Sequence, residues 1–194
     1  MISAIVLAAG LARRFGSAKP LALYEAKPLV RHVVDRLAVA DVTDVIVVVP
    51  RPAAAYASAL AGTRARTVVN EAPADGMSSS LHVGLSALDP WTQAVLVALA
   101  DQPMIEPDVL VSMIREWRAS RSPIVAPVYR GERGHPVLFA AAVFPELRAV
   151  SGDRGARDVI ERDQRRVRLM AIDRDLPRDI DTPEDLAALN DLAR

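Results

Sequence analysis

The residues best suited to chemistry lie near the amino terminus, in a loop that follows an apolar segment. Residues 2–7 lead into a loop that contains Gly10, Arg14, Gly16 and Lys19. Small residues let the backbone approach a phosphate group, free N–H groups donate to its oxygens, and cationic side chains offset its charge. These features favour a nucleoside triphosphate as the ligand. The glycine spacing matches neither G-x-x-x-x-G-K-[ST] nor G-x-G-x-x-G, so an ordinary surface loop is the alternative.

Acidic residues at two places could hold a divalent cation. Asp101 follows an apolar run over residues 95–100, and a carboxylate at the carboxyl end of a buried strand faces the crevice where such sheets bind ligands. Asp179 and Asp181 lie just before Thr182, and strand alternation would direct both carboxylates to one side. If their segment runs beside the strand that ends at Asp101, two carboxylates could share one ion. The alternatives are a turn at Asp101 and a helix cap at Asp181 or Thr182.

Three further segments combine glycine with polar residues. They are Gly76-Met77-Ser78-Ser79-Ser80-Leu81, Arg133-Gly134-His135-Pro136 and Gly152-Asp153-Arg154-Gly155-Ala156-Arg157. The first could let a nucleotide base or ribose approach the backbone, although the serine-rich first turn of a helix explains it equally well. His135 is expected in an exposed loop, where functional residues are common. The arginines of the third segment could bind an anionic substrate or lie in a solvated turn.

The elements that position these residues are indicated by apolar runs that alternate with helical patterns. Strands are predicted over residues 2–7, 45–49, 67–69, 94–99, 124–128 and 167–172, and helices over residues 29–38, 53–61, 78–88, 107–118, 156–162 and 183–192. This alternation predicts an α/β fold, a single-domain three-layer Rossmann-like arrangement with a mostly parallel sheet. Residues 1–194 are expected to form one domain, in which residues 129–178 are interpreted as a substrate-side insertion over the sheet.

Composition narrows the class of protein. The 194 residues are 51% hydrophobic but only 4% aromatic, which suits a parallel sheet built from Val, Leu, Ile and Ala. Lys and Arg total 24, as do Asp and Glu, so no excess of basic residues indicates a nucleic-acid partner. The absence of cysteine excludes disulfides, thiolate metal sites and a thiol nucleophile. Without a basic leader or an apolar stretch of membrane-spanning length, we expect no membrane partner and a cytoplasmic location.

Taken together, these motifs resemble those of the MobA-like nucleotidyltransferases, a family that acts on the molybdenum cofactor. Residues 7–19 resemble the signature L-A-A-G-x-S-x-R-[FM]-G-x-x-K, and the polar segments described above match in order over almost the whole chain. Leu7-Ala8-Ala9-Gly10 stands where guanylyltransferases usually have L-A-G-G, which favours the cytidylyltransferase branch and therefore CTP over GTP. Ala12 departs from the signature, which has serine there, and this removes one hydroxyl that could contact phosphate.

The resemblance implies a fold like that of the nucleotide-diphospho-sugar transferases and a role for each matching residue. Lys19, Arg14 and Asp101 are expected to be catalytic, and Asp101 and Asp181 are expected to bind Mg²⁺. Nucleotide binding is expected from Leu7, Ala8, Ala9, Gly10, Arg14, Lys19, Gly76, Ser78, Ser79 and Ser80. Binding of the second substrate is expected from His135, Asp153 and Arg157.

The implied reaction transfers CMP from CTP to the terminal phosphate of the molybdopterin cofactor and releases pyrophosphate. A xanthine dehydrogenase-like molybdoenzyme would be a partner. Because the attacking phosphate oxygen is already charged, positioning and electrostatics supply the catalysis rather than a general base. Two alternatives stay open. One is the same type of enzyme with GTP, or with a sugar or alcohol phosphate as acceptor; the other is a non-catalytic carrier of the pterin cofactor, because fold alone does not decide activity.

Overall fold

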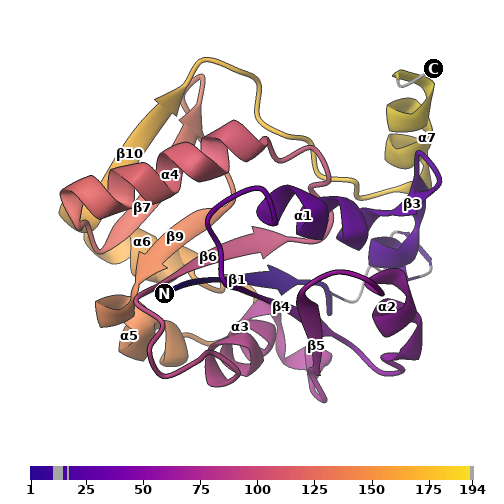
Figure 1. Ribbon diagram of the computed structural model, residues 1–194, viewed down its shortest axis with the longest axis horizontal. Helices are drawn as coiled ribbons and strands as arrows, with labels where there is room; N and C mark the ends of the chain where they lie inside the picture. The colour runs from indigo at the N-terminus through magenta and orange to yellow at the C-terminus, as the bar shows by residue number, and fades with distance from the viewer. Residues whose placement is uncertain (11–14, 17, 193–194) are drawn as a thin grey trace.

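An eight-stranded sheet forms the centre of the computed structural model, which describes residues 1–10, 15, 16 and 18–192 (Figure 1). The strands follow the order β10-β7-β9-β6-β1-β4-β5, and β8 pairs with β7. Their bounds are β1 Ile2–Leu7, β4 Asp44–Val49, β5 Ala65–Val69, β6 Ala94–Leu99, β7 Ile124–Tyr129, β8 Glu132–Arg133, β9 Val137–Ala140 and β10 Val167–Ile172. Parallel pairs join β1 to β4 and β6, β4 to β5, and β10 to β7. The sheet is therefore mostly parallel, as predicted.

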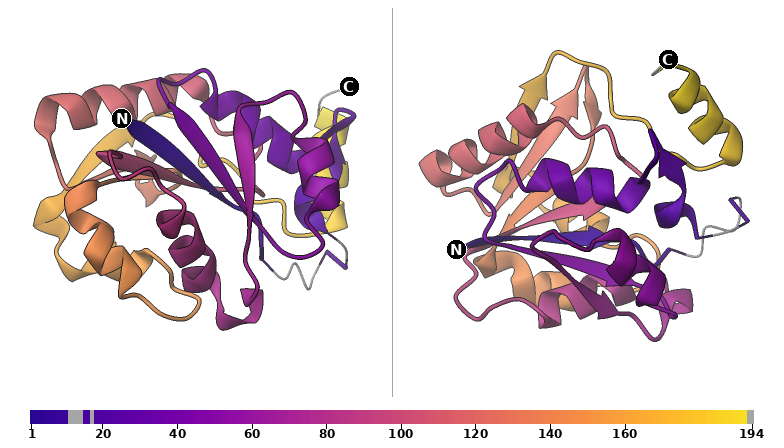
Figure 2. Two further views of the ribbon diagram at one scale, coloured as in Figure 1. Left: turned by 60° about the horizontal axis from the view of Figure 1, so that its bottom comes forward. Right: turned by 45° about the vertical axis from the view of Figure 1, so that its right-hand side comes forward.

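Side chains of the central strands alternate between two apolar cores. On β1, Ala4 and Val6 pack into one core, whereas Ile5 packs into the other. Helices α1 (Leu29–Leu37), α2 (Ala54–Ala59) and α4 (Pro107–Ser120) supply residues to the first core, and α3 (Met77–Ser86), α5 (Phe144–Arg148) and α6 (Arg157–Arg162) supply residues to the second. Helices thus cover both faces of the sheet (Figure 2), and the predicted three-layer arrangement is confirmed.

Residues 129–178 do not form an insertion over the sheet, so that part of the prediction is wrong. They supply β9, which lies between β6 and β7 and is antiparallel to both, and β10 at the edge of the sheet. A four-residue apolar run gives little periodic signal, and its pairing partners are remote in sequence, which is why β9 was not predicted. The predicted strands and helices all lie within about two residues of observed ones.

Residues 179–181 return to the carboxyl ends of the central strands. Ile180 is 2% exposed and packs with Tyr24 and Leu29 in a small third cluster. Tyr24 belongs to a hairpin formed by β2 (Leu23–Tyr24) and β3 (Lys27–Pro28), beside which α7 (Pro183–Leu192) lies in Figures 1 and 2. Asn190 joins them, because its Oδ1 accepts from the N–H of Glu25 at 3.2 Å. The carboxyl-terminal segment therefore packs against the amino-terminal part of the chain.

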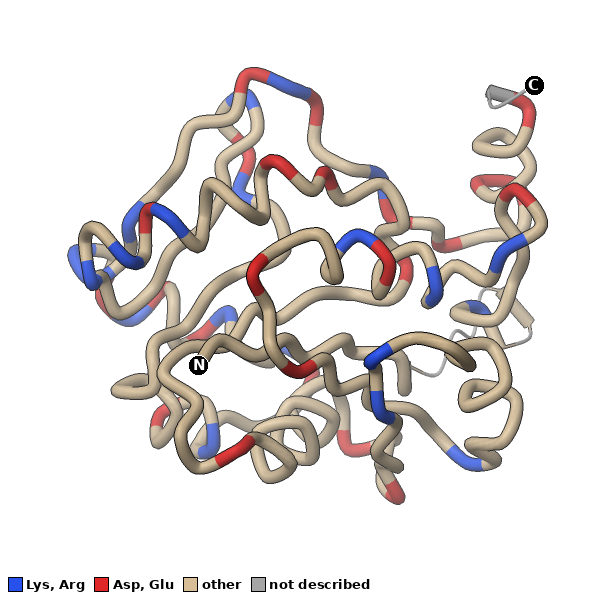
Figure 3. The backbone as a smooth tube through the Cα atoms, viewed as in Figure 1, with Lys and Arg blue, Asp and Glu red and all other residues tan. Residues whose placement is uncertain are grey.

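Charged residues of both signs are interspersed around the molecule, whereas β1 and β6 contain none (Figure 3). Within the described residues, no helix has both the length and the apolar character needed to cross a membrane.

Candidate active site

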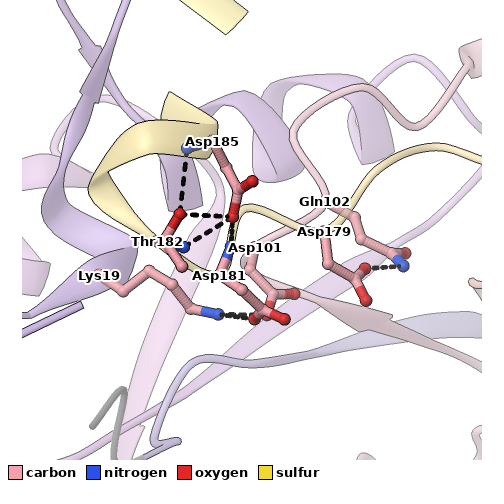
Figure 4. Close-up of polar contacts among 7 residues, drawn as sticks. All are labelled: Lys19, Asp101, Gln102, Asp179, Asp181, Thr182 and Asp185. Carbon is pink, nitrogen blue, oxygen red and sulfur yellow. Dashed lines mark hydrogen bonds and ion pairs between the residues drawn. The ribbon is translucent and has the colours of Figure 1, made fainter. Parts of the chain in front are cut away.

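Three charged side chains from distant parts of the chain meet at the carboxyl ends of β1 and β6. Lys19 Nζ donates to Asp101 Oδ2 at 2.7 Å and to Asp181 Oδ1 at 3.0 Å (Figure 4). Lys19 begins the short 3₁₀ turn Lys19–Leu21, Asp101 follows β6, and Asp181 precedes α7. The Lys19 side chain is only 13% exposed and that of Asp101 22%, against 48% for Asp181. The cluster is therefore partly withdrawn from solvent.

Backbone hydrogen bonds hold these elements together. The N–H of Ala100 donates to the carbonyl of Leu7 at 3.1 Å, which joins the ends of β6 and β1, and the N–H of Ile180 donates to the carbonyl of Asp101 at 3.0 Å. Thr182 then begins α7 with a reciprocal cap. The N–H of Asp185 donates to Thr182 Oγ1 at 3.2 Å, and the N–H of Thr182 donates to Asp185 Oδ2 at 2.8 Å. The structure thus brings Asp101 and Asp181 together.

The charge of Lys19 is stabilised by its two partners. Burial alone lowers the pKa of Lys19, but the charges and hydrogen bonds of Asp101 and Asp181 outweigh burial and raise that pKa above its ordinary value. Lys19 is therefore protonated at neutral pH, and the stabilisation that its ammonium group contributes is lost as the pH rises through the raised value.

The predicted amino-terminal nucleotide residues adjoin this cluster. A cavity of about 90 Å³ is lined by Leu7, Ala8, Gly10, Lys19, Ala100 and Asp101, among others. Ala9 is buried in the core on the α3 side of the sheet. Arg14 and Ala12 lie outside the described residues.

The serine segment begins α3 but uses its hydroxyl groups inside the protein. Asn70 Nδ2 donates to Ser79 Oγ at 2.8 Å and to Ser80 Oγ at 3.0 Å. Ser78 is 4% exposed, and its N–H donates to the carbonyl of Gly152 at 3.1 Å. The N–H of Ser79 also donates within the protein, to the carbonyl of Gly76 at 3.2 Å. The hydrogen bond from Ser78 to Gly152 ties the serine segment to the Gly152–Arg157 turn.

A larger cavity of about 510 Å³ lies on the other side of Leu7. Its apolar lining includes Leu7, Leu81, Val97, Phe139 and Ile160, and its polar lining includes Gln102, His135, Asp153, Arg157 and Asp179. The three residues predicted to bind the second substrate are all among them. Concave sites with apolar walls and a few convergent polar groups are typical of small-molecule binding.

His135 does not lie in an exposed loop, contrary to the prediction. Its side chain is largely buried, and Nδ1 is buried without a hydrogen-bond partner within the described part of the chain. Burial lowers the pKa of His135, and the backbone of Val97 and the charges of Asp179 and Asp101 only partly oppose this effect. The imidazole is therefore neutral at pH 7. It can accept or donate one hydrogen bond at the wall of the cavity.

Gln102 and Asp179 form a polar pair in the cavity wall that sequence reasoning missed. Gln102 Nε2 donates to Asp179 Oδ1 at 2.6 Å, so in Figure 4 Asp179 reaches toward Gln102, whereas Asp181 reaches toward Lys19. The predicted alternation of Asp179 and Asp181 is wrong because their segment forms no strand. Burial raises the pKa of Asp179, the hydrogen bond from Gln102 lowers it, and the charges of Asp101 and Asp181 raise it further. The only sequence signal was the adjacency of Gln102 to Asp101.

The chemistry of the carboxylate pair suits a hard divalent cation. Among the described residues, no group of three or more His, Cys, Asp or Glu side chains forms a ready metal site. Asp101 and Asp181 nevertheless supply carboxylate oxygens around one point, and Asp101 Oδ1 is buried without a hydrogen-bond partner in the described structure. Mg²⁺ is typically held by one or two carboxylates, with phosphates of the substrate and water as its other ligands. The residues therefore fit such an ion.

A third hollow, of about 460 Å³, lies away from these groups. Trp91, Trp117, Arg121 and Ala140 are among its lining residues. They lie around the amino-terminal end of β6, the paired end of β9 and the carboxyl-terminal end of α4, whereas ligands of open α/β sheets bind beyond the carboxyl ends of the strands. The two cavities that meet at Leu7 are therefore the candidate site.

Comparison with known proteins identifies the family of this chain. Residues 4–167 match the model of the MobA-like NTP transferase domain. A probable molybdenum cofactor guanylyltransferase from Pyrococcus horikoshii is 30% identical over 154 residues, which are 78% of this chain and 73% of that protein. The bifunctional protein GlmU of Sorangium cellulosum is 29% identical over 120 residues. That match covers 58% of this chain but only 25% of GlmU, so the chain corresponds to about a quarter of that longer protein.

Solved structures give the same result. The crystal structure of Rv0371c from Mycobacterium tuberculosis superposes with a TM-score of 0.87 at 30% identity, covering 98% of this chain and 97% of that one. A structure of Rv0371c in complex with manganese superposes with a TM-score of 0.82 at 29% identity, with the same coverage of both chains. The extent of the family match, the shared fold and the identity to the Pyrococcus protein lead to one conclusion. The chain belongs to the MobA-like NTP transferase family and is a nucleotidyltransferase.

Proposed function

We propose that this chain is a Mg²⁺-dependent cytidylyltransferase that transfers CMP from CTP to the terminal phosphate of the molybdopterin cofactor. The observation that carries the proposal is the Lys19–Asp101–Asp181 cluster. Lys19 and Asp101 line the small cavity beside Ala8 and Gly10, and Leu7 lines both that cavity and the 510 Å³ cavity. A phosphate-binding backbone on one side and an acceptor cavity on the other are what a nucleotidyl transfer requires.

The proposed reaction is an in-line displacement at phosphorus. An oxygen of the acceptor phosphate forms a bond to the α-phosphorus of the nucleotide, and the bond from that phosphorus to the bridging oxygen of the β-phosphate breaks. The electron pair leaves with pyrophosphate. No proton has to be removed from the nucleophile, and the neutral His135 is therefore assigned to binding rather than to base catalysis.

Each part of the site has a role in this scheme. Lys19 would offset negative charge on the triphosphate, together with Arg14, while the backbone of residues 8–10 and Gly76 with the adjoining serines 78–80 would contact the nucleotide. Asp101 and Asp181 would hold Mg²⁺, which when bound offsets negative charge on phosphate oxygens. His135, Asp153 and Arg157 would bind the acceptor, with Arg157 suited to its phosphate. The manganese complex of Rv0371c supports a divalent ion.

The choice of nucleotide rests on the Leu7–Gly10 motif, whose Ala9 favours CTP. The Pyrococcus relative is named a guanylyltransferase, and this supports GTP as the second candidate. Ala9 is buried at the carboxyl end of β1. Ala9 would therefore influence the choice of base through the course of the backbone after β1. Its buried methyl group would not contact the base directly.

A direct assay tests the proposal. We expect pyrophosphate release when the protein is incubated with CTP, Mg²⁺ and molybdopterin cofactor, and at least tenfold lower kcat/KM with GTP. Asp101→Asn keeps the size of the side chain but loses its charge, and should lower kcat by roughly 10²–10³-fold, the scale of removing one preorganised electrostatic group. Asp35→Asn is the matched control, because Asp35 pairs with Lys27 and Arg31 on α1.

Three results would contradict the proposal. No pyrophosphate with any nucleotide would remove the enzymatic function, and faster turnover with GTP would remove the cytidylyl assignment. Full activity of Asp101→Asn would remove the carboxylate pair as the centre of the reaction.

A further inference from the structure

Lys19 occupies the position that the proposed function gives to the divalent cation. Its ammonium group contacts one oxygen of Asp101 and one of Asp181, the two carboxylates assigned to that ion (Figure 4). Mg²⁺ binds oxygen ligands at about 2.0–2.1 Å in near-octahedral geometry. Lys19 Nζ lies 2.7 Å from Asp101 Oδ2 and 3.0 Å from Asp181 Oδ1, so an ion bound to the same two carboxylates, including through Asp101 Oδ1, would lie close to the ammonium charge and be repelled by it.

The ammonium group also explains why the two carboxylates can lie together without an ion. They come from positions 101 and 181, and negative charges at such short range repel one another. Lys19 offsets both charges, and because its side chain is 13% exposed and that of Asp101 22%, solvent screens this contact less than the contact with Asp181, whose side chain is 48% exposed. Within the described residues, the ionic site is therefore already assembled in the protein alone, and Lys19 is a cation of it.

A second position for the same ammonium group lies beside it. Lys19 lines the 90 Å³ cavity with Ala8 and Gly10, where the proposed function places phosphate oxygens. A triphosphate would therefore offer Lys19 an alternative set of anionic partners. Rotation about the flexible lysine side chain, rather than movement of an element, is enough to exchange them.

On the basis of the proposed function, we infer that Lys19 is a resident counter-ion that competes with the divalent cation until nucleotide binds. The nucleotide attracts the ammonium group to its phosphates and so frees the oxygens of Asp101 and Asp181. Nucleotide and cation then bind cooperatively, and by thermodynamic reciprocity each increases the affinity for the other by the same factor.

The test measures Mn²⁺ binding without turnover, from the electron paramagnetic resonance signal of the free ion. Wild-type protein, Lys19→Met and Lys27→Met are titrated with Mn²⁺ alone, and again with an unreactive analogue of CTP or GTP whose α,β-bridging oxygen is a methylene group. We expect Lys19→Met to bind Mn²⁺ alone about tenfold more tightly than wild type, within the usual range of such couplings. Lys27→Met is the control, because Lys27 pairs with Asp35 on α1, and it should bind Mn²⁺ like wild type.

The titrations with the nucleotide analogue give an independent measurement of the coupling between nucleotide and ion. In wild type, the bound analogue should tighten Mn²⁺ binding by about tenfold or more, and this factor should be smaller in Lys19→Met. If Lys19→Met does not fold, two measurements still test whether Lys19 competes with the ion. They are Mn²⁺ binding by Lys19→Gln and the effect of the bound analogue on Mn²⁺ binding by wild type. Equal or weaker Mn²⁺ binding by the Lys19 variants would overturn the inference. So would a wild type that binds Mn²⁺ equally well with and without bound analogue. If neither analogue binds, the proposed function fails, and the comparison with Mn²⁺ alone still decides the role of Lys19.

Discussion

Three aspartates lie close together at the carboxyl end of the sheet, and their partners differ. Asp101 and Asp181 contact Lys19, whereas Asp179 accepts a hydrogen bond from Gln102, whose side chain is almost fully buried. The charges of Asp101 and Asp181 act against the ionised form of Asp179. An ionised Asp179 therefore costs stability in the folded protein, and its position in the cavity wall indicates that the cost serves binding.

Replacing Asp179 by asparagine separates the cost of the ionised carboxylate to stability from its contribution to binding. The folded-state pKa of Asp179 is raised above its unfolded value, mainly by burial, so the cost is present at pH 7 and disappears as the pH falls through the raised pKa. Asp179→Asn should raise the Tm on the order of 1 °C at pH 7, because solvent screening leaves only part of a 1 kcal/mol effect. It should raise the KM of the acceptor roughly tenfold and leave the KM of the nucleotide unchanged.

Thermal unfolding at pH 7 and near pH 4, together with steady-state kinetics, checks this prediction. Asp175→Asn is the control, because Asp175 is an exposed residue of the same segment that pairs with Arg130. A lower Tm for Asp179→Asn at pH 7, or a gain that grows on acidification, would show that the carboxylate stabilises the fold instead.

At the scale of elements, the start of α3 is tied to the Gly152–Arg157 turn at one glycine. Gly76 has a φ of 91°, and a Cβ at that position would lie 2.6 Å from the carbonyl carbon of Gly152 and from Asp153 Oδ1. The N–H of Ser78 donates to the carbonyl of Gly152 across the same contact. The segment proposed to contact the nucleotide and the turn proposed to contact the acceptor are therefore held in one arrangement.

Gly76→Ala should lower the free energy of unfolding by more than backbone strain alone would. Gly62 also has a positive φ, of 75°, but a Cβ there would meet nothing within 4 Å, which makes Gly62→Ala the matched control. We expect each variant to lose about 1 kcal/mol of unfolding free energy from backbone strain. Gly76→Ala should lose a further 1–3 kcal/mol, of the order found for overpacked sites, and should raise the KM of both substrates. Urea unfolding measures the difference, and equal losses would mean that the turn moves away freely.

The sequence predicts individual strands and helices better than it predicts which elements lie beside one another in the fold. β1 and β6 are uninterrupted apolar runs, and Thr182 with Pro183 and two acids is a strong helix start, so these were placed correctly. β9 and the β2–β3 hairpin are too short for a periodic signal, and tertiary pairing alone defines them. Within the site, Asp101 and Asp181 were identified from their positions in the chain. Their shared contact with Lys19 and the Gln102–Asp179 pair depend on how the carboxyl-terminal segment packs, which no local pattern encodes.

At the scale of the whole molecule, the site is completed only when the segment before α7 packs against residues 19–29. Asp181 is the one residue of the cluster that comes from the carboxyl-terminal segment, and it is held there by the packing of Ile180 against Tyr24 and Leu29 and by the N–H of Ile180 on Asp101. This small cluster is separate from the two cores that flank the sheet. Elements with few buried contacts open locally before the whole domain unfolds. We therefore expect the completeness of the site to depend on a local equilibrium of residues 180–192, and not only on global stability.

Ile180→Ala tests that dependence. Truncation of a buried isoleucine removes about 2–4 kcal/mol, and here the loss should fall on the docking of the carboxyl-terminal segment. We expect faster amide hydrogen exchange over residues 180–192 and a kcat at least tenfold lower, with little change in the Tm of the main transition. Leu110→Ala is the control: Leu110 is fully buried in the core beneath α4, so its loss should lower the Tm and leave kcat unchanged at temperatures where the protein is folded. The opposite pattern, in which Ile180→Ala unfolds the whole domain while the folded fraction keeps its full kcat, would mean that the carboxyl-terminal segment is an integral part of the main core. The position of Asp181 would then be as secure as that of Asp101.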